Sequence, residues 1–181
     1  MARAAKATAS RKKNNRVNDN VVFENVRIIF RNFKGEEKPY NRAGHREFCV
    51  VIDEEGFAKK LSSDGWNVKV LPPRDDDEES VFYIPVTVSY GPYPPKIFLL
   101  TRNNKVKLDE DTVGELDDAD IENVDLIMRP YNWDINGKTG VKAYLKSMYV
   151  KIREDILSEK YASYGNSGFD DEEDDEDDLP F

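Results

Sequence analysis

Two segments near the C-terminal end of the chain alternate basic and aromatic residues with the two-residue period of a β-strand. These residues are Arg129, Tyr131, Trp133, Lys142, Tyr144 and Lys146. An earlier segment adds Arg27, Arg31 and Phe33 in a similar pattern. On an exposed sheet face, cations can contact phosphates while rings stack on unpaired bases, which is the chemistry of single-stranded nucleic acid binding. An ordinary solvated sheet is the alternative, because Tyr and Trp are common in strands.

Strands must position these residues, and the sequence predicts several short ones. Asn136-Gly137 lies between the two C-terminal segments and favours a type I′ hairpin turn. Further strands are predicted in NVRIIFRNF, REFCVVID, WNVKVLP, VFYIPVTVSY, KIFLLT and KVKL. In NVRIIFRNF we expect Val26, Ile28 and Phe30 on the face opposite Arg27, Arg31 and Phe33. Pro85 predicts an edge or a bulge in its strand.

Helices play a small part in this pattern. EEGFAKKLSSDG fits a short helix that ends at Gly65, and TVGELDDADIEN predicts a second, acidic one. The fold class is therefore all-β with one or two short helices. Strands at this spacing indicate a small barrel or sandwich.

The net charge of −9 conceals an uneven distribution. Residues 1–16 contain six Lys or Arg and no acid, whereas residues 170–178 are nine consecutive acids. Two further acidic patches occur at residues 75–79 and 109–125, and the rest of the body is net basic. The acidic total therefore does not exclude a nucleic acid partner. The basic N-terminus also resembles a transit peptide, but it lacks a bulky apolar face, so we favour a flexible arm.

Catalytic and metal-binding signals are weak. His45 and Cys49 are the only residues of their types, which argues against a catalytic triad and a four-ligand zinc site. The segment from Asp109 partly resembles a calcium loop, but Val113 and Asp120 occupy positions where that loop needs other residues. We predict no enzymatic activity, no cofactor and no metal. A single cysteine favours a reducing compartment, and no apolar run is long enough to span a membrane.

The C-terminal tip combines acids with apolar residues at the very end. Its last five residues are Asp177, Asp178, Leu179, Pro180 and Phe181. A solubilising tail would not need an apolar end, whereas a terminal Phe with its carboxylate can fill a pocket on a partner protein. The acids would steer that encounter and compete with nucleic acid for the basic groove.

The tip DDLPF resembles the acidic C-terminal tip of bacterial single-stranded DNA-binding proteins. The body resembles bacteriophage single-stranded DNA-binding proteins, broadly the T7-type group, in three segments. These are NVRIIFRNFKGEEKPYNRAGHREFCVVID, SYGPYPPKI and RPYNWDINGKTGVKAYLKSMYVKI. The resemblance implies an OB-fold, a five-stranded Greek-key barrel that holds single strands in a groove, and a tail that recruits replication partners. The basic arm and the absence of a Gly/Gln-rich linker depart from the bacterial type, so a tetramer is not implied and homo-oligomerisation stays open.

Together these features predict a disordered basic arm (1–20), an OB-fold domain (21–156), a linker (157–169) and an acidic interaction tail (170–181). The predicted function is binding of single-stranded DNA in replication, recombination or repair, in the cytoplasm of a bacterial host. Stacking is expected from Phe33, Tyr131, Trp133 and Tyr144, and phosphate contact from Arg27, Arg31, Arg129, Lys142 and Lys146. The alternative is an acidic DNA mimic or adaptor that binds a DNA-processing enzyme. The loop after Phe33 adds Lys38 and Tyr40 and could close over a ligand.

Overall fold

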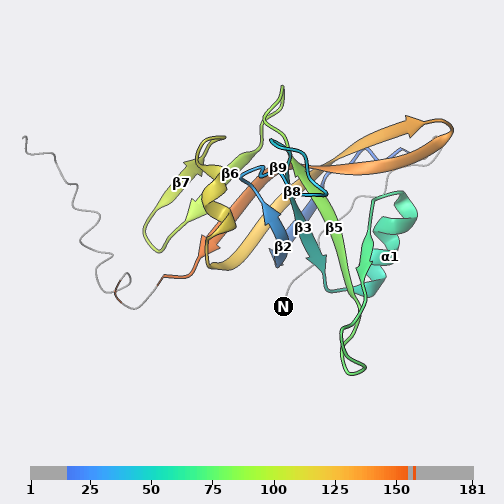
Figure 1. Ribbon diagram of the computed structural model, residues 1–181, viewed down its shortest axis with the longest axis horizontal. Coiled ribbons are helices and arrows are strands. Elements are labelled where there is room, and N and C mark those ends of the chain that lie inside the picture. The colour runs from blue at the N-terminus through green and yellow to red at the C-terminus, as the bar shows by residue number, and fades with distance from the viewer. Residues whose placement is uncertain (1–15, 155–156, 158–181) are drawn as a thin grey trace, which may run out of the picture.

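The computed structural model describes residues 16–154 and Leu157, and about half of these residues are in β-strands (Figure 1). The elements of this range are β1 (Val21–Val26), β2 (Ile28–Asn32), β3 (Arg46–Ile52), α1 (Glu55–Asp64), β4 (Lys69–Leu71), β5 (Val81–Val88), β6 (Lys96–Leu100), β7 (Lys105–Leu108), the 3-10 helix η1 (Val113–Asp117), β8 (Ile121–Ile135) and β9 (Lys138–Ile152). The predicted mostly-β class is confirmed. No helix among these residues has the length and apolar character needed to cross a membrane.

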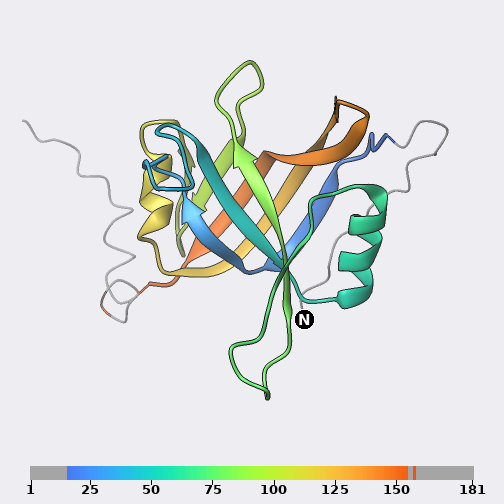
Figure 2. The ribbon, with the colours of Figure 1, turned by 45° about the vertical axis from the view of Figure 1, so that its right-hand side comes forward.

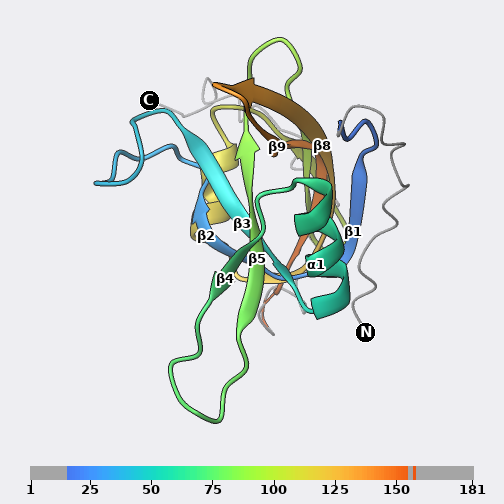
Figure 3. The same cartoon turned by 90° about the vertical axis from the view of Figure 1, so that its right-hand side faces the viewer.

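Five segments close the sheet on itself (Figures 2 and 3). The strand order β1–β8–β9–β5–β3–β2 begins and ends on β1 and β2, which only Arg27 separates and which form one bent segment. Neighbours in this order are antiparallel, except β5 and β9, which are parallel. This arrangement is the OB-like fold that the resemblance implied. The remaining strands extend it, since β4 pairs with β5 and β6 pairs with both β9 and β7.

The interior of the barrel is filled by one face of each strand. Large side chains with almost no exposure come from every segment of the ring. They include Phe23, Phe33, Phe48, Ile84, Leu126, Met128, Leu145 and Met148. Because successive side chains of a strand point to opposite faces, burial of this set turns the intervening residues of β5, β8 and β9 outward. The outer face is therefore free to carry polar and aromatic groups.

Helix α1 agrees with the prediction and ends at Gly65, whose φ of 105° places it in the left-handed region. This conformation lets the backbone N–H of Trp66 donate to the carbonyl of Leu61 at 3.0 Å and finish the helix. The N–H of Val141 then donates to the carbonyl of Gly65 at 2.9 Å. The end of the helix is thereby joined to β9 four residues after the turn of the β8–β9 hairpin.

The faces predicted for the first segment are partly wrong. Val26 and Ile28 are buried as expected, but Phe30 is 59% exposed. The cause is local, because Phe30 has a φ of 53° and the pairing of β2 with β3 shifts register between Ile29 and Asn32. A one-residue shift moves every later side chain to the other face. The shift turns Phe33 into the core, where its ring stacks on Phe48 at 5.0 Å.

The folded part of the chain begins earlier than residue 21. Val17 is buried, its N–H donates to Oδ1 of Asn132 at 2.8 Å, and Nδ2 of Asn132 donates back to its carbonyl at 2.7 Å. Val17 therefore packs against the barrel four residues before the predicted start of the domain at residue 21. The predicted linker and tail lie outside the described residues apart from Leu157.

Pro85 occupies a break in the pairing of β5. On one side it lies opposite Cys49 of β3. On the other side β4 pairs with residues 81–83 and β9 with residues 86–87, so Pro85 falls between the two partners. A residue without a backbone N–H suits this gap, as the prediction of an edge or bulge required.

Candidate nucleic-acid interface

The β8–β9 hairpin places the alternating basic and aromatic residues side by side. Its turn has the left-handed φ values of a type I′ turn, 53° at Asn136 and 79° at Gly137. Arg129 pairs with Tyr144, Tyr131 with Lys142, and Trp133 with Gly140. The two predicted sets therefore share one outward face of the hairpin, which extends from the barrel (Figure 1).

Tyr144 is the centre of this cluster. The guanidinium carbon of Arg129 lies 5.0 Å from the centre of its ring, and Nζ of Lys142 lies 5.2 Å from it. Both distances are within the range of cation–π attraction. The ring of Tyr131 meets Tyr144 edge to face at 5.8 Å and is itself 53% exposed. The hairpin thus places two cations and an exposed tyrosine ring around Tyr144.

Trp133 lies flat across the opposite strand. A Cβ atom added to Gly140 would come within 2.4 Å of the indole ring, so only glycine leaves room for it. Trp133 borders a hollow of about 470 Å³ on the outside of the sheet. Lys69, Thr87 and Lys142 line the same hollow.

A second hollow of about 470 Å³ continues this face across β5 and β3. The two hollows share Lys69, Pro85 and Glu47, so they form one groove. At its far end the ring of Phe30 meets Tyr83 edge to face at 5.7 Å. The loop between β2 and β3 supplies the wall with Lys38 and Tyr40, the latter 85% exposed. In OB-folds, this face and the loops at its two ends are where oligonucleotides bind.

Most groove residues beyond the hairpin could not be recognised in the sequence. Phe30 was expected on the face opposite the basic residues of its strand, and Lys69 and Tyr83 lie in strands with no alternation of bases and rings. Only Lys38 and Tyr40 had a signal, as part of a polar loop that could cover a ligand. The pairing of Thr87 in β5 with both Glu47 and Tyr144 joins these distant segments into one surface.

The groove contains one carboxylate and one thiol. Nε2 of His45 lies 2.9 Å from the Glu47 carboxylate, so the only histidine is engaged at the groove wall. Burial raises the pKa of the Cys49 thiol to about 12. A neutral, buried thiol is a poor nucleophile. The other charged groups at the groove are basic, including Lys38, Lys69 and Lys142.

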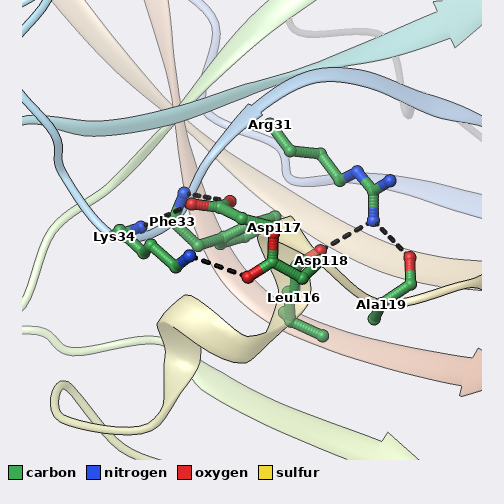
Figure 4. Close-up of polar contacts among 7 residues, drawn as sticks. All are labelled: Arg31, Phe33, Lys34, Leu116, Asp117, Asp118 and Ala119. Carbon is green, nitrogen blue, oxygen red and sulfur yellow. Dashed lines mark hydrogen bonds and ion pairs between the residues drawn. The ribbon is translucent and has the colours of Figure 1, made fainter.

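Arg31 lines the far end of the groove beside Phe30, and its guanidinium also has a structural role. The expectation that Phe33 stacks on a base is wrong because its ring is fully buried. Nη1 of Arg31 donates to the carbonyls of Leu116 and Ala119 at 2.7 and 2.8 Å (Figure 4). The Asp117 carboxylate accepts from the backbone N–H of Phe33 at 2.7 Å. These bonds fix η1, where a short acidic helix was expected, against the end of β2.

Arg27 and Lys146 lie away from the groove. Arg27 borders a separate hollow, where three carboxylates, those of Asp53, Asp120 and Glu122, balance three arginines, Arg27, Arg31 and Arg153. Lys146 follows the cluster along β9 and lines a further hollow with Arg129. The structure thus brings together Arg129, Tyr131, Trp133, Lys142 and Tyr144 on the hairpin. Arg31 lines the far end of the groove, whereas Arg27 and Phe33 lie outside it.

The segment considered as a calcium loop is a tight turn. The Asp109 carboxylate accepts hydrogen bonds from the backbone of Asp111 and from both the backbone and hydroxyl of Thr112. The hydrogen bonds from Thr112 lower the pKa of the Asp109 carboxyl. Among the described residues, no group of three or more His, Cys, Asp or Glu side chains is placed to hold a metal ion.

The chain belongs to the phage single-stranded DNA-binding family: residues 9–179 match the family described as "Putative phage ssDNA-binding domain". This match confirms the resemblance to bacteriophage proteins of this class. The narrower resemblance to the T7-type group, and that of the tip to bacterial proteins, stay predictions. No match was found among curated protein sequences.

The fold is similar to solved structures of the single-stranded DNA-binding protein from bacteriophage Enc34. The structure of that protein in complex with ssDNA shares 12% identity, covers 75% of this chain and 88% of its own, and has a TM-score of 0.50. Its C-terminal truncation shares 13% identity over 75% of this chain and 87% of its own, with a TM-score of 0.49. At these identities the similarity concerns the fold alone.

Proposed function

We propose that this protein binds single-stranded DNA without enzymatic activity and with little sequence preference, in the groove over the outer faces of β3, β5, β9 and β8. The observation that carries the proposal is the continuity of the groove, which runs from Phe30 and Tyr83 to Trp133 and Lys142 of the hairpin. Lys142 in turn contacts the ring of Tyr144 at 5.2 Å, so the groove ends beside the hairpin cluster. Family membership supports the same function.

In this proposal the binding free energy has two contributions, the stacking of bases on rings and the contact of cations with phosphates. Each ring that stacks on a base contributes about 1–3 kcal/mol, and every base has a face that can stack, so sequence matters little. Each cation that neutralises a phosphate adds a salt-dependent term with a slope of about −0.7 for single strands. If Lys38, Lys69, Arg129 and Lys142 all contact phosphates, the slope is about −3.

A fluorescence-anisotropy titration of labelled poly-dT and of a matched duplex tests the proposal at low and moderate salt. We expect tight binding to the single strand, weaker binding to the duplex and a loss of affinity as salt increases. The rival function, an acidic protein that mimics DNA, predicts no affinity for either. Absence of single-strand binding at low salt would therefore favour the mimic.

The tail proposal concerns residues outside the described range. We propose that the acidic residues 170–178 compete with DNA for the groove and that Leu179, Pro180 and Phe181 recruit replication, recombination or repair proteins in the host cytoplasm. Deleting residues 170–181 should tighten DNA binding, because a competing polyanion is removed. Weaker DNA binding after the deletion would contradict the competition.

A further inference from the structure

A hollow separate from the groove has the composition of a nucleic acid site. It has a volume of about 730 Å³ and is bordered by β6, β9 and the loop before β6. Its lining includes three aromatic rings, two prolines and three cations, namely Tyr93, Phe98, Tyr149, Pro92, Pro94, Lys96, Arg129 and Lys146. No Asp or Glu lines it, although the chain has 36 acidic and 27 basic residues. We call this hollow the distal pocket.

Two rings at the floor of the distal pocket are held in place by strand pairing. Phe98 of β6 is the parallel partner of Tyr149 of β9, and their rings stack at 5.0 Å with an interplanar angle of 19°. Nζ of Lys105 lies 4.4 Å from the centre of Phe98 and 5.3 Å from that of Tyr149. Lys105 does not line the pocket itself, but its cation lies close to both rings, which places a phosphate contact beside a stacking surface.

Arg129 connects the distal pocket to the groove. Its guanidinium carbon lies 5.0 Å from the ring of Tyr144, which Lys142 of the groove also contacts, and 5.6 Å from the ring of Tyr93 at the pocket. Tyr93 is 74% exposed, so its ring is available to a ligand. The Arg129 guanidinium therefore contacts one aromatic ring on the groove side and one on the side of the distal pocket.

Strand β9 continues the alternation of bases and rings into the pocket. Opposite β9, Met128 pairs with Leu145 and Ile127 with Ser147, so Lys146 is an extra residue in a bulge. The bulge keeps Tyr149 on the outer face together with Tyr144, about 17 Å along the strand. A single strand of DNA that follows β9 out of the groove would therefore meet the distal pocket next.

We propose that the distal pocket binds further nucleotides of the DNA strand that occupies the groove. In this arrangement bases stack on Tyr93 and on the Phe98–Tyr149 pair, and Lys96, Lys105 and Lys146 contact phosphates. The inference rests on the proposed function and extends the binding site of one protomer along β9. It makes affinity depend on oligonucleotide length in a way that the groove alone does not.

The test compares dT oligonucleotides of about 6 and about 20 nucleotides, lengths chosen because OB-folds cover about 4–16 nucleotides. Short oligonucleotides should occupy the groove, which has the larger number of rings. Tyr149→Ala should weaken binding of the long oligonucleotide about 5-fold to 140-fold and leave the short one unchanged. Tyr149→Phe is the matched control, because it keeps the ring and should bind both lengths like the wild type.

Tyr93→Ala provides a second variant in an exposed loop, where folding is least at risk, and should reproduce the length-dependent loss. A groove variant, Tyr144→Ala, should weaken binding of both lengths. If Tyr93→Ala and Tyr149→Ala bind both lengths normally while Tyr144→Ala weakens both, the distal pocket proposal is wrong and the proposed function stands. If the wild type binds neither length, the proposed function itself fails. Binding of a synthetic peptide of residues 170–181 at the pocket, with normal binding of the long oligonucleotide by the variants, would also overturn the inference.

Discussion

Replacing Tyr144 by alanine removes the ring at the centre of the hairpin cluster. Its ring is contacted by Arg129 at 5.0 Å, Lys142 at 5.2 Å and Tyr131 at 5.8 Å. Loss of one stacked base costs about 1–3 kcal/mol, which corresponds to about 5-fold to 140-fold in Kd. Because two cations also lose the surface against which they rest, we expect a loss in the upper half of this range.

The assay is an anisotropy titration of labelled poly-dT at one fixed salt concentration, and thermal unfolding checks that the variant is folded. Tyr144→Phe is the matched control, since it keeps the ring and loses only the hydroxyl, and it should bind within about twofold of the wild type. A folded Tyr144→Ala protein with wild-type affinity would refute the assignment of this cluster to DNA binding.

The remaining predictions concern charge, packing and pH. Lys69→Ala and Lys142→Ala should each make the salt slope of poly-dT binding shallower by about 0.7, measured as log Kd against log salt, and an unchanged slope would exclude that lysine from phosphate contact. Gly140→Ala should destabilise the protein by about 1–3 kcal/mol in urea unfolding and shift the Trp133 fluorescence, because the new methyl group would lie 2.4 Å from the indole. Burial raises the pKa of the Cys49 thiol from 9.0 to about 12. The thiol therefore ionises at a lower pH in the unfolded chain than in the folded one. The free energy of unfolding should therefore fall as pH rises from about 9 to about 12, and less so in Cys49→Ala.

Local patterns in the sequence predicted the elements that depend on local geometry. The Asn136-Gly137 turn has the expected φ values, and the strands on either side bring Arg129 opposite Tyr144. Gly65 ends α1 as its position predicted. These features follow from turn chemistry and side-chain periodicity, which act over a few residues.

Features that depend on register or on distant pairing could not be predicted in the same way. The left-handed φ of Phe30 exchanges the faces of β2, so Phe30 becomes exposed and Phe33 is buried. An alternating sequence pattern gives no sign that one of its residues has a left-handed φ. Non-glycine residues rarely adopt this conformation, so it would not be expected at a phenylalanine. The groove also needs the parallel pairing of Thr87 with Tyr144, which joins segments far apart in the chain.

The claim that the outer face of β3, β5, β9 and β8 holds a single strand is tested most directly by photo-cross-linking. Poly-dT that carries 5-iododeoxyuridine is bound to the full chain and irradiated, and the modified peptides are identified by mass spectrometry. We predict cross-links to aromatic residues of the groove, with Tyr131, Trp133 and Tyr144 among them. Cross-links confined to residues outside this face would contradict the account.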